Sequence, residues 1–136
     1  MNEKKIPAKI LIKRLQRAYK IMDKMTPHER RKHFDMGKWG QKTECGTVGC
    51  LAGHCGLDPW FKKEGFEFRF DKKPDSNGRF YGGFVGGWRK PEQFFGTQIH
   101  YQILMDTDAK YGQIKRKVAK AIEHLKKDGV VGYLGT

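Results

Sequence analysis

The sequence predicts an α+β fold that is mainly helical and carries one small aromatic β-hairpin. Two long segments, residues 7–25 and 113–127, repeat apolar residues at helical spacing, and residues 66–70 alternate strictly between aromatic and charged side chains. A chain of 136 residues is close to the usual length of one domain. We therefore expect residues 1–136 to form a single basic domain, with a flexible N-terminus at 1–6 and a tail at 129–136.

The two long helices are predicted to be amphipathic and one-sidedly cationic. In the first, Leu11, Leu15, Ala18 and Met22 follow the i, i+4, i+7, i+11 rhythm of one helix face. The last helix repeats the pattern and should end at Gly129. Lysines and arginines occupy the opposite faces and are the expected anion-binding residues: Lys13, Arg14, Arg17 and Lys20 in the first helix, and Lys115, Arg116, Lys117 and Lys120 in the last.

Shorter elements are expected between the two long helices. Thr26, Pro27 and Glu29 form a capping-box pattern and predict a short helix to about His33. Residues 45–56 are mostly small and predict a tightly packed helix with Thr47 as its N-cap. The alternating run at 66–70, a turn at 75–78 and the run at 80–85 predict the hairpin, and residues 91–105 predict a helical region that restarts at Thr97. We expect the long helices to pack around the cysteine helix and the hairpin to cover one side.

The composition favours an anionic partner. The chain has 28 Lys and Arg against 15 Asp and Glu, a net charge of +13. Such a field attracts phosphates, and exposed aromatic residues such as Trp39 or Trp88 beside it could stack on bases. We expect a nucleic acid or an anionic nucleotide as the partner, or alternatively an acidic protein. No segment has the roughly 20 apolar residues of a membrane span and no signal peptide is evident, so we expect no membrane partner and a cytoplasmic protein.

The cysteine segment leaves several interpretations open. If a helix begins after Thr47, Cys50 lies in its first turn, where the helix end lowers a thiol pKa, with His54 four residues on; this is the material of a nucleophilic pair. Cys45, Cys50 and His54 could alternatively ligate a metal, although Cys45 and Cys50 lack common zinc spacing. The favoured interpretation is small buried thiols that pack a short helix, with no cofactor and no metal.

The glycines of the cysteine segment could help to bind an anion. Amides of Gly46, Thr47 and Gly49 at a helix start could bind a phosphate, but the order of a P-loop is absent and a turn with an N-cap is favoured.

Two resemblances concern the same residues. The tripeptides Glu-Cys-Gly at 44–46 and Cys-Leu-Ala at 50–52 resemble the nucleophile segment of bacteriocin-processing cysteine peptidases. This resemblance implies Cys45 as the nucleophile. More broadly, residues 34–127 resemble a family of small phage and bacterial proteins with an aromatic-Trp segment followed by a C-G-T-x-x-C-x-A-G-[HW] core. That resemblance implies a phage or mobile-element origin.

Three function classes follow from these observations. The first is a non-enzymatic phage or bacterial accessory protein that binds nucleic acid or a nucleotide-like anion, acting on host nucleic-acid or defence machinery in the host cytoplasm. The second is a cysteine-nucleophile enzyme using Cys45 or Cys50 with His54. The third is an inhibitor that presents a basic surface to an acidic host protein.

Overall fold

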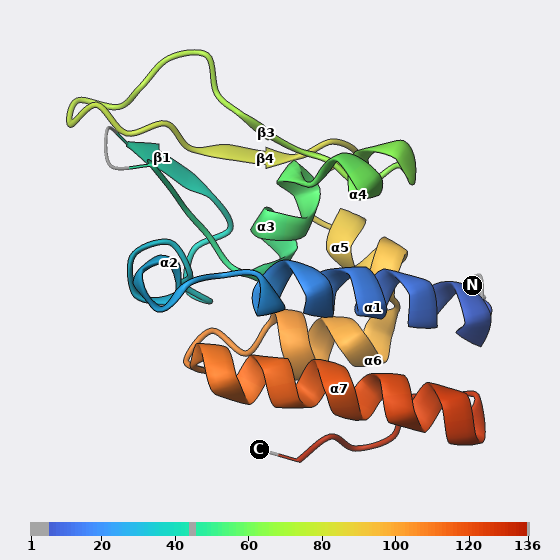
Figure 1. Cartoon of the computed structure of the whole chain (residues 1–136). Coiled ribbons are helices and arrows are strands. Elements are labelled where there is room, and N and C mark those ends of the chain that lie inside the picture. The colour runs from blue at the N-terminus through green and yellow to red at the C-terminus, as the bar shows by residue number, and fades with distance from the viewer. Residues whose placement is uncertain (1–5, 44–45, 136) are drawn as a thin grey trace.

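The computed structural model describes residues 6–43 and 46–135, and it confirms a mainly helical α+β fold with an aromatic hairpin (Figure 1). In chain order the elements are α1 Ala8–Asp23, α2 Pro27–Lys32, β1 Gln41–Thr43, β2 Gly46–Val48, α3 Leu51–Leu57, α4 Pro59–Lys63, β3 Phe68–Phe70, β4 Gly82–Phe84, α5 Lys90–Phe95, α6 Thr97–Ile99, the π-helical turn η1 His100–Leu104, and α7 Tyr111–Asp128.

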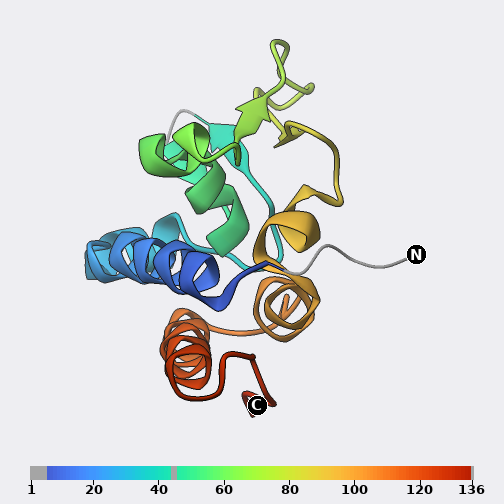
Figure 2. The same cartoon turned by 90° about the vertical axis from the view of Figure 1, so that its right-hand side faces the viewer.

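The helix α1 is the central element of the molecule. It lies between α3 on one side and α7 on the other, with α5 and α6 behind it (Figures 1 and 2). Of the predicted apolar stripe of α1, Leu15, Ala18 and Met22 are buried and Leu11 is partly buried against the core. Its C-terminal end is tied to the start of α7, because Tyr111 Oη donates to the Met22 carbonyl and Lys115 Nζ lies 2.7 Å from Asp23 Oδ1. The expectation that both long helices surround the cysteine helix needs correction, because α7 packs on α1 and η1 instead.

The predicted ends of the helices are formed by local hydrogen bonds. Thr26 Oγ1 accepts from the Glu29 amide at 3.2 Å and Glu29 Oε1 accepts from the Thr26 amide at 3.0 Å, so the capping box before α2 is complete. At the end of α7, Gly129 takes a left-handed conformation with φ +75, which a residue with a side chain adopts at a cost.

The strands form two antiparallel pairs joined by one bridge. Phe68, Arg69 and Phe70 pair with Phe84, Gly83 and Gly82, which confirms the predicted hairpin. The pair β1–β2 was not predicted, because three-residue strands with a glycine carry little periodic signal. Backbone hydrogen bonds between Lys42 and Phe80 link the two pairs, so the strands follow the spatial order β2, β1, β4, β3.

An aromatic cluster fills the space between the hairpin and the helices. Its buried members, with ring centroids 4.8–6.0 Å apart, are Phe61, Phe66, Phe68, Phe84, Phe94 and Phe95. The backbone of Trp39 packs directly against Gly53 of α3, since a Cβ at Gly53 would lie 1.6 Å from the Trp39 carbonyl oxygen. Glycine at this position therefore lets α3 approach the preceding loop directly.

The C-terminal segment folds back along α7. Leu134 is buried, its amide donates to Gln102 Oε1 at 2.8 Å, and Gln102 Nε2 donates to the Gly132 carbonyl at 3.0 Å. The segment expected as a tail at 129–136 is thus part of the packed structure up to Gly135. The predicted flexible N-terminus lies, apart from Ile6, outside the described residues. Within the described ranges no helix is both long and apolar enough to cross a membrane.

Candidate nucleic-acid interface

The cysteine helix begins later than the sequence suggests. Gly46–Val48 is the strand β2, and the helix α3 starts at Leu51, so Thr47 is not its N-cap. Cys50 takes that position, and its Sγ accepts a hydrogen bond from the Gly53 amide at 3.4 Å. The pairing of Thr47 with Lys42 explains the difference, because the amides around Thr47 belong to a β-ladder rather than to a helix end.

This environment does not activate Cys50. The thiol is buried, and burial raises its pKa to about 11, the opposite of the lowered pKa expected at a helix start. His54 has other partners: its Nε2 donates to the His33 carbonyl at 2.6 Å and its ring stacks on Phe34. Burial also raises the pKa of Cys55 well above its ordinary value. Cys50 is thus a buried N-cap of α3, and His54 packs on Phe34.

Metal binding gains no support from the described residues. Within 6–43 and 46–135, no group of three histidine, cysteine, aspartate or glutamate side chains is arranged to hold a metal ion. Cys45, which both the metal and the peptidase interpretations need, lies outside the described residues, so its role stays a prediction.

The proposed phosphate loop is occupied by backbone pairing. Gly46 and Thr47 pair with Thr43 and Lys42 in β1, and the Gly49 amide donates to the His33 carbonyl at 3.1 Å. These groups lie in a strand and a bridge rather than at a helix N-terminus, so the geometry on which the anion interpretation depends is absent at Gly46–Val48.

Several of the predicted anion-binding cations have partners inside the protein. Arg17 makes a bidentate ion pair with Asp58, and its side chain is partly buried. Arg14 lies over the Phe94 ring and donates to the Phe94 carbonyl. On the last helix, Lys115 pairs with Asp23, Lys117 is buried against Asp106, and Lys120 Nζ donates to the Leu134 carbonyl at 3.3 Å. Lys13, Lys20, Lys120 and Arg116 remain exposed.

The two predicted tryptophans differ in exposure. Trp39 is 38% exposed and its ring packs on Phe84 at 5.2 Å, so it forms the edge of the aromatic cluster. Trp88 is 64% exposed and lies in the segment between β4 and α5, with the Arg89 guanidinium 5.1 Å from its ring centroid. Gly86 and Gly87 precede it with φ of +99 and +98, a conformation that glycine adopts without strain.

The outward face of the hairpin adds further aromatic, apolar and cationic side chains to this surface. Tyr81 and Val85 are exposed and alternate with Gly83 along the strand, and a Cβ at Gly83 would meet nothing within 4 Å. Arg69, opposite Gly83 in the register, is also exposed. The sequence contains a signal for this face. Odd-numbered residues within 67–71 and 81–85 alternate with the phenylalanines, so their side chains lie on the opposite face of the hairpin.

Comparisons of the chain with protein-family models, with curated proteins and with solved structures found no match. The fold and the exposed side chains thus define a small, strongly basic, mainly helical α+β protein. Its open aromatic and cationic surface lies on the hairpin and on the segment after it.

Proposed function

We propose that this protein binds single-stranded nucleic acid through a surface that we call the hairpin arm, residues 69–90. The observation that carries the proposal is the exposed Trp88 indole with the Arg89 guanidinium over one of its faces. An exposed indole beside an arginine is a stacking platform for a base, because every base has a π-face and the guanidinium pairs with phosphate.

The charge of the hairpin arm supports the same partner. It contains six lysines and arginines against two aspartates. Arg69 is paired with Glu67 and Arg79 with Asp75. Lys72, Lys73, Arg89 and Lys90 have no ion-pair partner among the described residues, and the first three are exposed. Cations without internal partners are available to neutralise phosphates and release counterions.

The shape of the arm suits a single strand better than a packed protein partner. Tyr81 and Val85 lie on one strand face, on either side of the bare Gly83, which leaves room above the strand for a flat group. The long loop between β3 and β4 projects from the body of the molecule, and the yellow segment after β4 runs down its side to α5 (Figure 2). The sugar-phosphate backbone of a single strand can therefore cross the hairpin face toward Trp88.

In this proposal the cationic faces of α1 and α7 contribute to the electrostatic attraction of the nucleic acid but do not contact it. Lys13 and Lys20 are exposed on one face of α1, and Arg116 and Lys120 on α7. These cations add to the potential that attracts a polyanion over distances of about one Debye length, roughly 8 Å at physiological salt. The resemblance of the cysteine core to small phage and bacterial proteins extends the proposal. On that basis we propose a phage or bacterial accessory protein that acts on host nucleic-acid or defence machinery in the cytoplasm.

The test is fluorescence anisotropy with a labelled oligothymidylate of roughly 15 nucleotides, a length within the site sizes of single-strand binders. The double variant Lys72→Gln with Lys73→Gln removes two charges from the arm. The matched control, Lys126→Gln with Lys127→Gln, removes two exposed charges at the far end of α7. The arm variant should bind more weakly and reduce the salt slope of log K by about 1.4, because a single strand gives about 0.7 per phosphate contact.

Trp88→Ala tests the stacking part separately. It should weaken binding about 10-fold, whereas Val130→Ala, which removes an exposed apolar side chain from the C-terminal segment, should leave oligothymidylate binding unchanged. Equal losses in the two double variants would overturn the proposal. So would absence of binding at about 150 mM salt, which would instead favour the acidic protein partner.

A further inference from the structure

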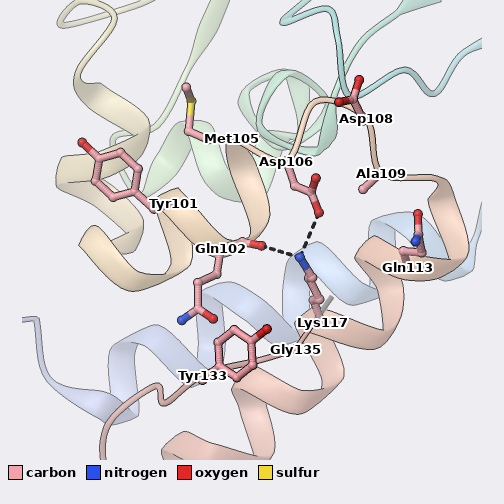
Figure 3. A pocket seen from close by; sticks show the side chains of 10 residues that line it. All are labelled: Tyr101, Gln102, Met105, Asp106, Asp108, Ala109, Gln113, Lys117, Tyr133 and Gly135. Carbon is pink, nitrogen blue, oxygen red and sulfur yellow. Dashed lines mark hydrogen bonds and ion pairs between the residues drawn. The ribbon is translucent and has the colours of Figure 1, made fainter.

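A second surface of the molecule is hollowed, at the opposite end from the hairpin arm. The hollow has a volume of about 530 Å³ and lies between the π-helical turn η1, the first half of α7 and the C-terminal segment (Figure 3). That volume is within the range of sites for small molecules, roughly 300–1,000 Å³. No residue of the hairpin arm lines it, so it is a separate site.

The rim of the hollow is unusually rich in exposed apolar side chains. Tyr101 is 60% exposed, Tyr133 is 78% exposed and Met105 is also exposed, and all three line it. A single exposed aromatic residue needs no explanation, but three large apolar groups around one hollow are typical of a binding surface. Tyr101 belongs to η1, and π-helical turns are frequent at functional sites.

The floor of the hollow carries polar groups that can form further hydrogen bonds. Lys117 is only 7% exposed, and its ammonium donates to Asp106 Oδ2 at 2.8 Å and to the Gln102 carbonyl at 3.0 Å (Figure 3). An ammonium has three donors, so one N–H has no partner among the described residues. The other oxygen of Asp106, Oδ1, likewise has no hydrogen bond there.

A third polar group lies along the same wall. Gln113 Oε1 accepts from the Lys110 amide at 2.8 Å, which leaves the two N–H donors of its side chain for a ligand. Together the hollow offers a cationic donor, neutral amide donors and a carboxylate acceptor within one pocket.

This combination selects the chemistry of the ligand. Asp106 and Asp108 both line the hollow, so a phosphate inside it would meet two carboxylates. The group that enters is therefore uncharged and flat enough to lie against the tyrosines. Every common base places a donor beside an acceptor, but guanine alone presents an acceptor, O6, followed by two donors, N1–H and N2–H, which matches a lysine beside a carboxylate.

Cations at the margin are placed for the phosphate of such a ligand. Lys110 is exposed and precedes the α7 residues of the wall. Lys120 is exposed and lies beside the C-terminal segment, with its Nζ 3.3 Å from the Leu134 carbonyl next to Gly135, which lines the hollow. We propose that this hollow binds the guanine base of a nucleotide, with the base against Tyr101 and Tyr133 and the phosphate outside, toward Lys110 or Lys120.

The experiment is isothermal titration calorimetry of the full chain with GMP, AMP, CMP and UMP as probes. GMP should bind saturably and at least about 10-fold more tightly than the other three, since a matched base edge gives discrimination of that order. Inorganic phosphate should not compete. Equal affinity for all four nucleotides, competition by phosphate, or no saturable binding of GMP at about 1 mM would overturn the proposal.

Two variants locate the binding. Tyr133→Ala should weaken GMP binding about 10-fold, because it removes a stacking ring from an exposed position without touching the core. Val130→Ala, the matched control at an exposed position of the same C-terminal segment that does not line the hollow, should leave GMP binding unchanged. Unchanged GMP affinity in Tyr133→Ala, or an equal loss in the two variants, would contradict the site.

The guanine could come from a free nucleotide or from a strand. Oligonucleotides of guanine-containing and guanine-free sequence, titrated into the Lys72→Gln with Lys73→Gln variant, separate the two sources. A preference for the guanine-containing strand identifies a strand base, and GMP binding without that preference identifies a free nucleotide. Because GMP binding does not depend on the hairpin arm, failure of the arm proposal leaves this one standing, and the reverse also holds.

Discussion

Arg17 on α1 and Asp58 before α4 are joined by two hydrogen bonds, from Nε to Oδ2 at 3.1 Å and from Nη2 to Oδ1 at 3.0 Å. The hydrogen bond that Arg17 donates to Asp58 also raises the pKa of the Arg17 guanidinium above its ordinary value. Asp58 Oδ2 in addition accepts from the amides of Trp60 and Phe61, so the same carboxylate caps α4. A residue that the sequence placed on a cationic strip is therefore a structural link between two helices.

Asp58→Ala should lower the free energy of unfolding by about 1–3 kcal/mol, because it removes both the N-cap and the acceptor of the Arg17 pair. Asp58→Asn keeps a capping oxygen and should cost less. Urea unfolding followed by circular dichroism measures both, with the exposed Glu123→Ala as the control. If Asp58→Ala matched Glu123→Ala, the link between α1 and α4 would have no role in stability.

Gly53→Ala should be strongly destabilising, by about 1–3 kcal/mol or more, because its Cβ would meet the Trp39 carbonyl oxygen at 1.6 Å and backbone must move. Gly83→Ala is the matched control on β4, where a Cβ meets nothing within 4 Å and stability should be retained. Thermal unfolding distinguishes the two variants. Equal melting temperatures would contradict the close contact between α3 and the loop before β1.

Leu134→Ala should cost about 2–5 kcal/mol, the usual range for a buried leucine, because Leu134 is 2% exposed although it lies near the end of the chain. Val130→Ala, at an exposed position of the same segment, should have little effect. Chemical denaturation compares the variants. A stable Leu134→Ala protein would show that the C-terminal segment does not pack on α7 in solution.

Cys50 and Cys55 should resist alkylation in the folded protein at pH 7–8, because burial raises both thiol pKa values and excludes the reagent. Iodoacetamide labelling followed by peptide mass spectrometry assigns the modified positions one by one. Both cysteines should react quickly once urea is added. Fast native labelling of Cys50 would support the nucleophile hypothesis, which the burial of its thiol now opposes.

The stability of the protein should decrease as the pH falls through the histidine range. Burial lowers the pKa of His54 in the folded state, whereas the unfolded chain protonates near the ordinary value of about 6.5. Below that pH the unfolded state binds more protons than the folded state, so the free energy of unfolding falls until the folded pKa is reached. Burial lowers the pKa of His100 as well, which adds a loss of the same sign.

His54→Gln should reduce this pH dependence between about pH 7 and pH 5, while His28→Gln, at an exposed position of α2, serves as the control. Urea midpoints at several pH values measure the slope. A variant with the wild-type slope would show that His54 does not contribute to it.

Much of the fold could be predicted from local patterns. The stripe Leu15, Ala18 and Met22, the capping box at Thr26 and the alternation at 66–70 each produced the expected element, because each signal depends on neighbours within a few residues. The strand β2 and the late start of α3 could not be read in this way. Pairing of Thr47 with Lys42 and the contact of Gly53 with Trp39 are made between segments, and they decide where the helix begins.

The candidate sites likewise depend partly on the sequence alone and partly on the tertiary structure. The sequence by itself determined the net charge, the two long amphipathic helices and the aromatic hairpin, since composition and periodicity are properties of the chain. Only the tertiary structure decided that Arg17 and Lys117 face partners within the protein, that Trp88 stays open to solvent, and that residues of η1, α7 and the C-terminal segment surround one hollow. The physical reason is that a cation's availability depends on which acids and carbonyls the folded backbone brings within hydrogen-bond distance, and those groups come from distant segments of the chain.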